Sequence, residues 1–210
     1  MQKKTFILAS ESPRRRQLLA RAGFNFSIVP SQITESDIAH GSPEETACLL
    51  AQAKAEAVAI DYPDDWVLGA DTIVAVSDQI LGKPASAQDA RRMLNQLSGQ
   101  SHRVISGYAI LHHGRKYLFS EAVGTTVQFK TLTPDEIGWY LATNEPFDKA
   151  GAYAIQGKGA WMIRRINGSY TNVVGLPMCE VVHSLARVGL AGHLFGQTSG
   201  IHTRRDRVFK

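Results

Sequence analysis

The sequence predicts an α/β fold in which helices cover a mixed β-sheet. Three observations support this fold class: strand-like apolar runs alternate with helical segments, several helices open with recognisable caps, and both strand–helix crossovers and β-hairpins are indicated. The 210 residues are 44% hydrophobic and 20% charged, which excludes a collagen-like or wholly disordered chain. The elements are spaced too irregularly for a doubly wound nucleotide-binding fold.

The N-terminal part of the chain predicts strand, helix, strand and helix. The apolar run 5–9 is expected to be a buried strand. Ser12 is a favoured N-cap for the helix that follows, and Gly23 is a favoured residue to end it. A second strand is predicted over 25–30. A capping box, in which Glu follows Ser by three residues, opens a helix over 42–60.

The next segment predicts two short strands and a tight turn. The two strands are expected over 66–69 and 73–76, and a small-residue segment that contains Asp71 separates them. A third strand is expected after the turn, over 79–81. In that hairpin residue 72 lies opposite residue 83. Asp71 and Lys83 are therefore expected to meet at the open end of the hairpin.

The C-terminal half predicts three helices and two hairpins. The helices are expected over 86–97, 133–141 and 177–188, and the long hairpin has strands over 104–112 and 117–129. Asn167-Gly168 is a preferred type I′ turn pair, so strands are predicted over 161–166 and 170–174. This second hairpin would carry Gln156 toward Gly175.

The charge distribution argues against a nucleic-acid partner. The formal net charge is +4, but acidic residues gather in residues 31–66. Residues 196–210 hold four basic residues and one acidic residue. The chain is patterned rather than uniformly basic. We expect one domain of two lobes over residues 1–190, a flexible basic tail over 191–210, and no binding to nucleic acid.

The cysteine and apolar patterns predict a cytoplasmic chain that does not enter a membrane. Cys48 and Cys179 lie far apart without a Cys-x-x-Cys pair or flanking His, so neither a disulfide framework nor a zinc site is expected. Only five residues separate Lys4 from Ser10, fewer than the roughly 7–15 of a signal-peptide h-region. No apolar stretch approaches the roughly 20 residues that span a bilayer.

Several common catalytic patterns are missing. Gly157-Lys158-Gly159 lacks the Ser or Thr that follows the lysine of a P-loop, and no G-x-G-x-x-G follows a strand. There is no G-x-S-x-G elbow, and the seven histidines have no metal-ligand spacing. Serine-hydrolase chemistry therefore has no support.

Three segments are candidates for chemistry. Arg14 and Arg15 lie in a first helical turn, where acids are usual; they suit a bound phosphate, or they form a solvated face. Asp71 could coordinate a metal or act as a base toward water, or be a turn residue satisfied by backbone N–H groups. Lys83 beside it could pair with the carboxylate or with a phosphate. Residues 145–157 crowd acid, base, aromatic and amide groups among small residues, which favours a ligand-binding loop.

These segments together resemble the Maf family of nucleotide pyrophosphatases. The matching strings run in order from about residue 5 to 188: LASESPRR at 8–15, GADTIV at 69–74, GKP at 82–84, SG and His102 at 98–102, DKAGAYAIQG at 148–157, INGSY at 166–170 and VVGLP at 173–177. The resemblance implies hydrolysis of nucleoside triphosphates to monophosphate and pyrophosphate with Mg²⁺ or Mn²⁺. It also implies the two-lobed α/β fold shared with inosine triphosphate pyrophosphatases, with the active site in the cleft, and a homodimer.

The resemblance also assigns roles to residues. The family's proton acceptor falls on Asp71, and its other active-site positions fall on Ser10, Arg14, Glu35, Lys54 and Lys83. The family positions at which the residue type varies with the substrate correspond to Arg14, Thr72 and Gln156 in this sequence. These three residues are similar to those of the dTTP/UTP subgroup and differ from those of the 7-methyl-GTP subgroup. No family motif matches beyond about residue 190.

A mechanism consistent with these residues has Asp71 and Glu35 holding the metal, with Asp71 orienting or deprotonating water. Lys54, Lys83, Arg14 and Arg15 would balance the phosphate charge, while Thr72 and Gln156 would read a pyrimidine edge. Two alternatives remain at this point. One is a house-cleaning pyrophosphatase for modified or purine nucleotides such as dITP, XTP or 7-methyl-GTP. The other is a non-enzymatic regulator of cell division.

Overall fold

The computed structural model describes residues 6–34, 41–77, 79–192 and 194. Within these residues the strands form one mixed sheet in the order β2-β1-β3-β5-β6-β7, and β4 pairs with β3. β1 is parallel to β2 and β3, whereas the other pairings are antiparallel. The predicted α/β class is therefore confirmed. Glu35 and residues 195–210 of the predicted tail lie outside the described residues.

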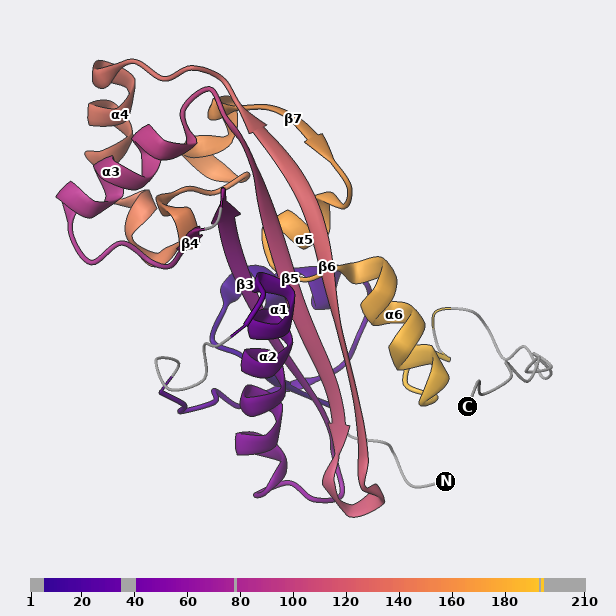
Figure 1. Cartoon of the computed structure of the whole chain (residues 1–210). Helices are drawn as coiled ribbons and strands as arrows, with labels where there is room; N and C mark the ends of the chain where they lie inside the picture. Colours follow the sequence, from indigo (N-terminus) through magenta and orange to yellow (C-terminus); the bar gives the residue numbers. More distant parts are fainter. Residues whose placement is uncertain (1–5, 35–40, 78, 193, 195–210) are drawn as a thin grey trace.

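The elements follow the chain in the order strand, helix, strand, helix at first, and then hairpins intervene (Figure 1). The strands are β1 (Phe6–Ala9), β2 (Ser27–Ile28), β3 (Trp66–Val76), β4 (Gln79–Leu81), β5 (Ser101–His112), β6 (Tyr117–Phe129) and β7 (Ile163–Asn167). The α-helices are α1 (Pro13–Arg21), α2 (Pro43–Ala59), α3 (Ala87–Leu97), α4 (Pro134–Leu141), α5 (Tyr170–Val174) and α6 (Met178–Arg187). Short 3-10 turns occupy much of the segment between α4 and β7.

The helix starts predicted from capping residues are confirmed. Ser12 accepts a hydrogen bond from the backbone of Arg15 at the start of α1. Ser42 and Thr133 form complete capping boxes at the starts of α2 and α4. Ser86 caps α3. Each of these bonds satisfies an N–H that has no partner within its helix, which is why such short sequence signals locate helix starts reliably.

Two strand predictions are corrected by the structure. Residues 66–76 form the single strand β3, and Asp71 lies in its middle instead of between two strands. The hairpin predicted over 161–174 is wrong: residues 157–162 are a 3-10 helix, only Ile163–Asn167 is a strand, and Tyr170–Val174 is the helix α5. Ser169 caps α5 through the backbone of Asn172, so the Asn167-Gly168 turn leads into a helix.

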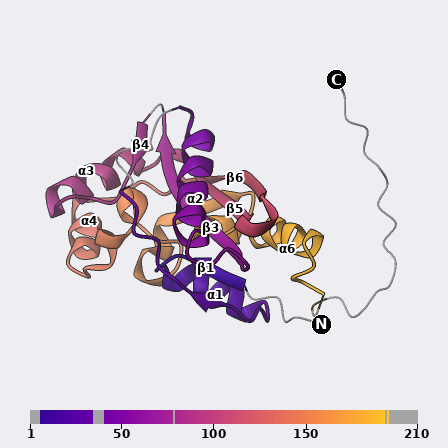
Figure 2. The same cartoon turned by 90° about the horizontal axis from the view of Figure 1, so that it is seen from below.

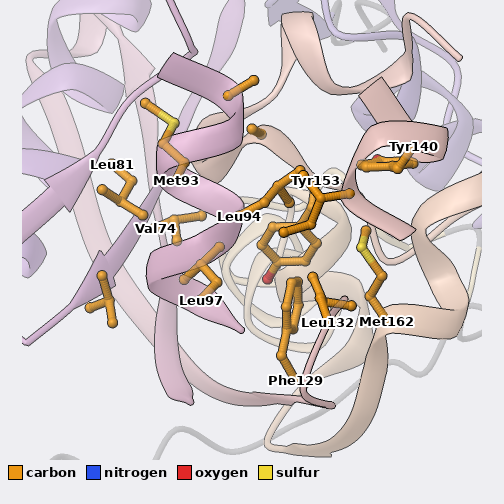
Figure 3. Packing of buried hydrophobic residues seen from close by; sticks show 14 of the residues in the cluster. Val74, Leu81, Met93, Leu94, Leu97, Phe129, Leu132, Tyr140, Tyr153 and Met162 are labelled. Atoms are coloured by element: carbon orange, nitrogen blue, oxygen red, sulfur yellow. The ribbon is translucent and has the colours of Figure 1, made fainter. Parts of the chain in front are cut away.

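The hydrophobic core is divided between the two ends of the sheet. At one end, α3 and α4 pack on β3, β5 and β6 around Leu94, Phe129 and Tyr153 (Figures 1 and 3). At the other end, α1 and α6 cover the sheet around Leu19 and Tyr108. β5 and β6 run through both ends and join them (Figure 1). Each end of the sheet therefore has a buried cluster of its own, and further buried clusters lie between α2 and the sheet.

Helix α2 packs closely against β3 and β5 (Figure 2). Its fully buried alanines face the sheet, and two glycines of the sheet lie beneath them. A Cβ atom on Gly69 would lie 2.1 Å from the carbonyl oxygen of Ala51, and one on Gly107 would lie 2.2 Å from that of Ala47. Small residues on both sides therefore set the distance between helix and sheet.

A buried histidine, His102, packs beside the core cluster beneath α3 and α4, and it allows us to predict how the stability of the fold depends on pH. His102 Nε2 lies 2.7 Å from the hydroxyl of Tyr153, and its ring packs against Phe129. Burial lowers the pKa of His102 from 6.5 to about 4. Between these values the unfolded chain binds a proton that the folded chain does not, so stability falls as the pH falls. From pH 7.5 to 5 this group should cost about 2 kcal/mol.

The measurement is urea unfolding of the wild type and His102→Asn at pH 7.5 and 5. The variant should lose less stability on acidification than the wild type does, because asparagine has no proton to take up. His113→Asn serves as a matched control, since His113 is exposed at the β5–β6 turn. Equal losses for wild type and His102→Asn would contradict the assignment.

Candidate active site

A cleft opens where one edge of β3 has no neighbouring strand. β1 pairs with β3 only as far as Gly69, and β4 begins to pair with it at Val74. At this gap, residues 71–74 line a cavity of about 660 Å³. This volume is within the usual range of small-molecule sites, and it lies beyond the carboxyl end of β1, where ligands of α/β sheets commonly bind.

The cleft gathers nearly all of the residues that the sequence indicated. Among the predicted site residues, those that line it are Ser10, Arg14, Arg15, Lys54, Asp71, Thr72, Lys83 and Gln156. Glu35 belongs to the undescribed segment 35–40. The segments that contribute these side chains are far apart in sequence, so their convergence is a property of the fold.

An ion pair between Lys54 and Asp71 forms part of the cleft wall. Lys54 Nζ lies 2.6 Å from Asp71 Oδ1, and the two side chains are 11% and 12% exposed. Lys54 extends from α2, and the close approach of that helix to Gly69 allows the contact. The hydrogen-bonded ion pair holds the carboxylate of Asp71 in a fixed position in the cleft wall.

The predicted meeting of Asp71 with Lys83 is replaced by this pair. The register expected for the hairpin is correct, because Val74 pairs with Leu81 and Val76 with Gln79. Lys83 follows β4 and lines the same cleft, but within the described part of the chain it forms no ion pair with Asp71. The cation that pairs with Asp71 is Lys54 of helix α2, and the register of the hairpin carries no information about the position of that helix.

Arg15 connects three elements behind the cleft. Its Nε donates to the carbonyl oxygen of Gly175 at 2.8 Å, and its two terminal nitrogens donate to Ser10 Oγ at 3.2 Å and Thr72 Oγ1 at 3.1 Å. The residue is only 9% exposed. Its planar guanidinium thereby fixes α1, β3 and the end of α5 relative to one another.

Asp71 and Thr72 leave β3 on opposite faces, as consecutive strand residues do. Asp71 meets Lys54 from α2, whereas Thr72 meets Arg15 from α1. Both still line one cleft, because the strand edge between them is open. The gap between β1 and β4 thus joins the two faces of the sheet into one site.

Arg14 contacts a residue on the opposite side of the cleft. Its guanidinium lies 3.5 Å from the carboxylate of Asp148, which also accepts a hydrogen bond from Lys149. Burial works to raise the pKa of Asp148, but the bond from Lys149 and the charge of Arg14 outweigh it, and the pKa is lowered. Arg14 and Asp148 therefore form a charged contact across the cleft.

The loop that carries Gln156 is anchored by Glu145. The carboxylate of Glu145 accepts hydrogen bonds from the backbone N–H groups of Lys158 and Gly159, at 2.9 and 3.0 Å. Gly157 has a φ of +73°, and a Cβ there would lie 2.6 Å from Glu145 Oε2. Gln156 and Gly175 line the same cleft, as expected, although the hairpin that was to bring them together does not exist.

The described oxygens of the cleft suit a hard divalent cation. Asp71 supplies a carboxylate within the wall, and the hydroxyls of Ser10 and Thr72 are other oxygens of the lining. Mg²⁺ is commonly held by one or two carboxylates together with substrate phosphates, so an all-protein cage is not needed. No group of three His, Cys, Asp or Glu side chains gathers within the described residues.

Comparison with known proteins identifies the family. The model of the family described as "Maf-like protein" matches residues 5–188. The chain belongs to the Maf family. It is 52% identical over 189 residues to a protein of Geobacter sulfurreducens named dTTP/UTP pyrophosphatase, covering 90% of this chain and 99% of the relative. A protein of the same name from Geobacillus is 50% identical, covering 89% and 99% of the two chains.

The solved structures that are similar to this Maf chain include that of a Ham1 protein. It is titled "The structure of the Staphylococcus aureus Ham1 protein", and it matches with a TM-score of 0.45 and 14% identity. The match covers 76% of this chain and 80% of that one.

Two buried polar residues that the sequence analysis did not single out support Thr72 from behind the cleft. Ser106 bonds to Thr72 Oγ1 at 2.9 Å and donates to the carbonyl oxygen of Asn172 at 3.0 Å. Asn172 is fully buried and donates to Val104 O and Thr125 Oγ1. A Ser-Gly pair within an otherwise apolar strand was the available signal for Ser106. Asn172 gave none, because the segment was expected to be a strand.

Proposed function

We propose that this chain hydrolyses dTTP and UTP to the nucleoside monophosphate and pyrophosphate. The observation that carries the proposal is the Lys54–Asp71 pair in a cleft that Arg14 and Lys83 also line. A carboxylate surrounded by cations is suited to cleaving a polyanion, since it can act on water while the cations bind the phosphates. The names of the 52% and 50% identical relatives support the same substrates.

In the proposed reaction Asp71 accepts a proton from the water that attacks the α–β phosphoanhydride, and Lys54 holds the carboxylate in place. Arg14 and Lys83 bind phosphate oxygens and stabilise the leaving pyrophosphate. Arg15 orders Ser10 and Thr72 beside them. A bound Mg²⁺ or Mn²⁺, held by Asp71 and Glu35, would lower the pKa of the attacking water and offset phosphate charge.

We propose that the enzyme selects its substrate by recognising the edge of the pyrimidine base. Gln156 lines the cleft and its amide offers both a donor and an acceptor, which is what a uracil or thymine edge requires. Thr72 and Arg14 complete the set of selectivity residues proposed. Arg14 would exchange its contact with Asp148 for a phosphate when the substrate binds.

The test is an incubation of purified protein with a panel of triphosphates and Mg²⁺ or Mn²⁺, with products separated by ion exchange. We expect dTTP and UTP to yield dTMP and UMP together with pyrophosphate. Release of orthophosphate and nucleoside diphosphate would contradict the proposal. Preference for dITP, XTP or 7-methyl-GTP would select the house-cleaning alternative, and no turnover of any triphosphate would favour a regulatory protein.

We further propose a homodimer that acts in the cytoplasm and does not bind nucleic acid. Within the described residues, the helices are too short or too polar to span a membrane. Light scattering tests the dimer. Binding to a DNA oligonucleotide that weakens steeply with salt would contradict the last expectation, and truncation before residue 196 would show whether the basic tail is responsible.

A further inference from the structure

Tyr170 contacts Gln156 from outside the lining of the cleft. Gln156 Nε2 donates a hydrogen bond to the hydroxyl of Tyr170 at 3.2 Å. Gln156 lines the cleft, whereas Tyr170 is not among its lining residues. Tyr170 therefore acts on the cleft only through the glutamine. We propose that Tyr170 is a positioning residue for pyrimidine selectivity, an inference that rests on the proposed hydrolysis of dTTP and UTP.

Both partners of this bond come from fixed backbone. Tyr170 is the first residue of α5, which Ser169 caps. The same helix is fastened to the sheet by the buried Asn172, through its bonds to β5 and β6. Gln156 precedes the turn that Glu145 anchors. The hydrogen bond is exposed, but because it joins two anchored segments it favours one rotamer of the glutamine over the others that a side chain without a partner would sample.

The hydrogen bond to Tyr170 determines which groups of the Gln156 amide remain available to a bound base. Donation to Tyr170 uses one of the two Nε2 hydrogens and orients the planar amide. The second Nε2 hydrogen and Oε1 are then the groups that a base in the cleft meets. Side by side, they match the O4 acceptor and N3–H donor of uracil and thymine. Cytosine offers the reverse order, an N4 donor and an N3 acceptor, and would require the amide to turn over.

The experiment compares Tyr170→Phe with the wild type on UTP, dTTP and CTP. The variant removes only a hydroxyl from a side chain that is 45% exposed, so folding should be retained and is checked by thermal unfolding. Loss of one hydrogen bond should raise KM for UTP and dTTP about 3- to 10-fold, with kcat changed less than about twofold. The preference for UTP over CTP should fall by a similar factor. Tyr62→Phe, which removes another exposed hydroxyl, should change neither value.

A double-variant cycle with Gln156→Ala separates positioning from a general structural role. Without the glutamine amide, Tyr170→Phe should have no further effect on KM or on selectivity. An undiminished effect in that background would overturn the proposal, and so would an unchanged KM in the single variant. If the wild type fails to hydrolyse UTP at all, it is the proposed function that fails, which the wild-type assay shows before any variant is compared.

Discussion

Asp71→Asn is expected to hydrolyse dTTP and UTP about 100- to 10,000-fold more slowly than the wild type while keeping the fold. Asparagine has nearly the same shape and can still accept a hydrogen bond from Lys54. It cannot take a proton from water, and it is a weaker ligand for a divalent cation. The loss should therefore appear mainly in kcat, which is measured from pyrophosphate release at saturating substrate.

Two further variants show whether the effect belongs to the carboxylate in the cleft. Asp135→Asn changes an exposed aspartate in the first turn of α4 and should leave turnover unchanged. Lys54→Met removes the cation that holds Asp71 and should also reduce kcat strongly. Circular dichroism checks that each variant is folded. An Asp71→Asn variant that is folded and retains most of its activity would remove Asp71 from the mechanism.

Gly69→Ala is expected to lower the free energy of unfolding by about 3 kcal/mol, although it adds only one methyl group. That methyl would lie 2.1 Å from the carbonyl oxygen of Ala51, so α2 must move away from β3. The ion pair with Asp71 depends on the position of α2, because Lys54 is part of that helix. Turnover should therefore fall together with stability. Urea unfolding and a pyrophosphate assay of the same samples measure both.

Gly107→Ala should act in the same way, since its Cβ would lie 2.2 Å from the carbonyl oxygen of Ala47. Gly192→Ala is the matched control: nothing lies within 4 Å of a Cβ at that position, and its stability should change by less than about 0.5 kcal/mol. Loss of stability of the same size in all three variants would show that the packing of α2 against the sheet is not its cause.

The helix starts were predictable because their causes are local. Ser12, Ser42, Ser86 and Thr133 each bond to a backbone N–H three residues along the chain, so the residues that determine the cap are adjacent in sequence. The long β5–β6 hairpin was predictable for a similar reason, since its strands are joined by a short turn. Local signals of this kind account for most of the elements of the fold.

The segments that were predicted wrongly depend on distant partners. Asp71 and Thr72 interrupt an apolar run, yet β3 continues through them because β5 pairs with it from Val67 to Ala75. The Asn167-Gly168 pair does mark a turn, but Asn172 is bonded to β5 and β6, and its segment folds as α5 instead of pairing with β7. In both cases contacts with the sheet overrode the local preference.

The sequence by itself predicted which residues would lie together, and Ser10, Asp71, Lys83 and Gln156 do line one cleft, because the strings around them match one family in order. Because the net charge is only +4 and the charged residues are unevenly distributed along the chain, the sequence also indicated basic groups at a few positions rather than a uniformly basic surface. Tertiary structure alone decided how those residues are paired. Lys54 reaches Asp71 because glycines let α2 approach the sheet, and both faces of β3 share one cleft because β1 ends before β4 begins. These are distances between elements far apart along the chain, which residue order does not specify.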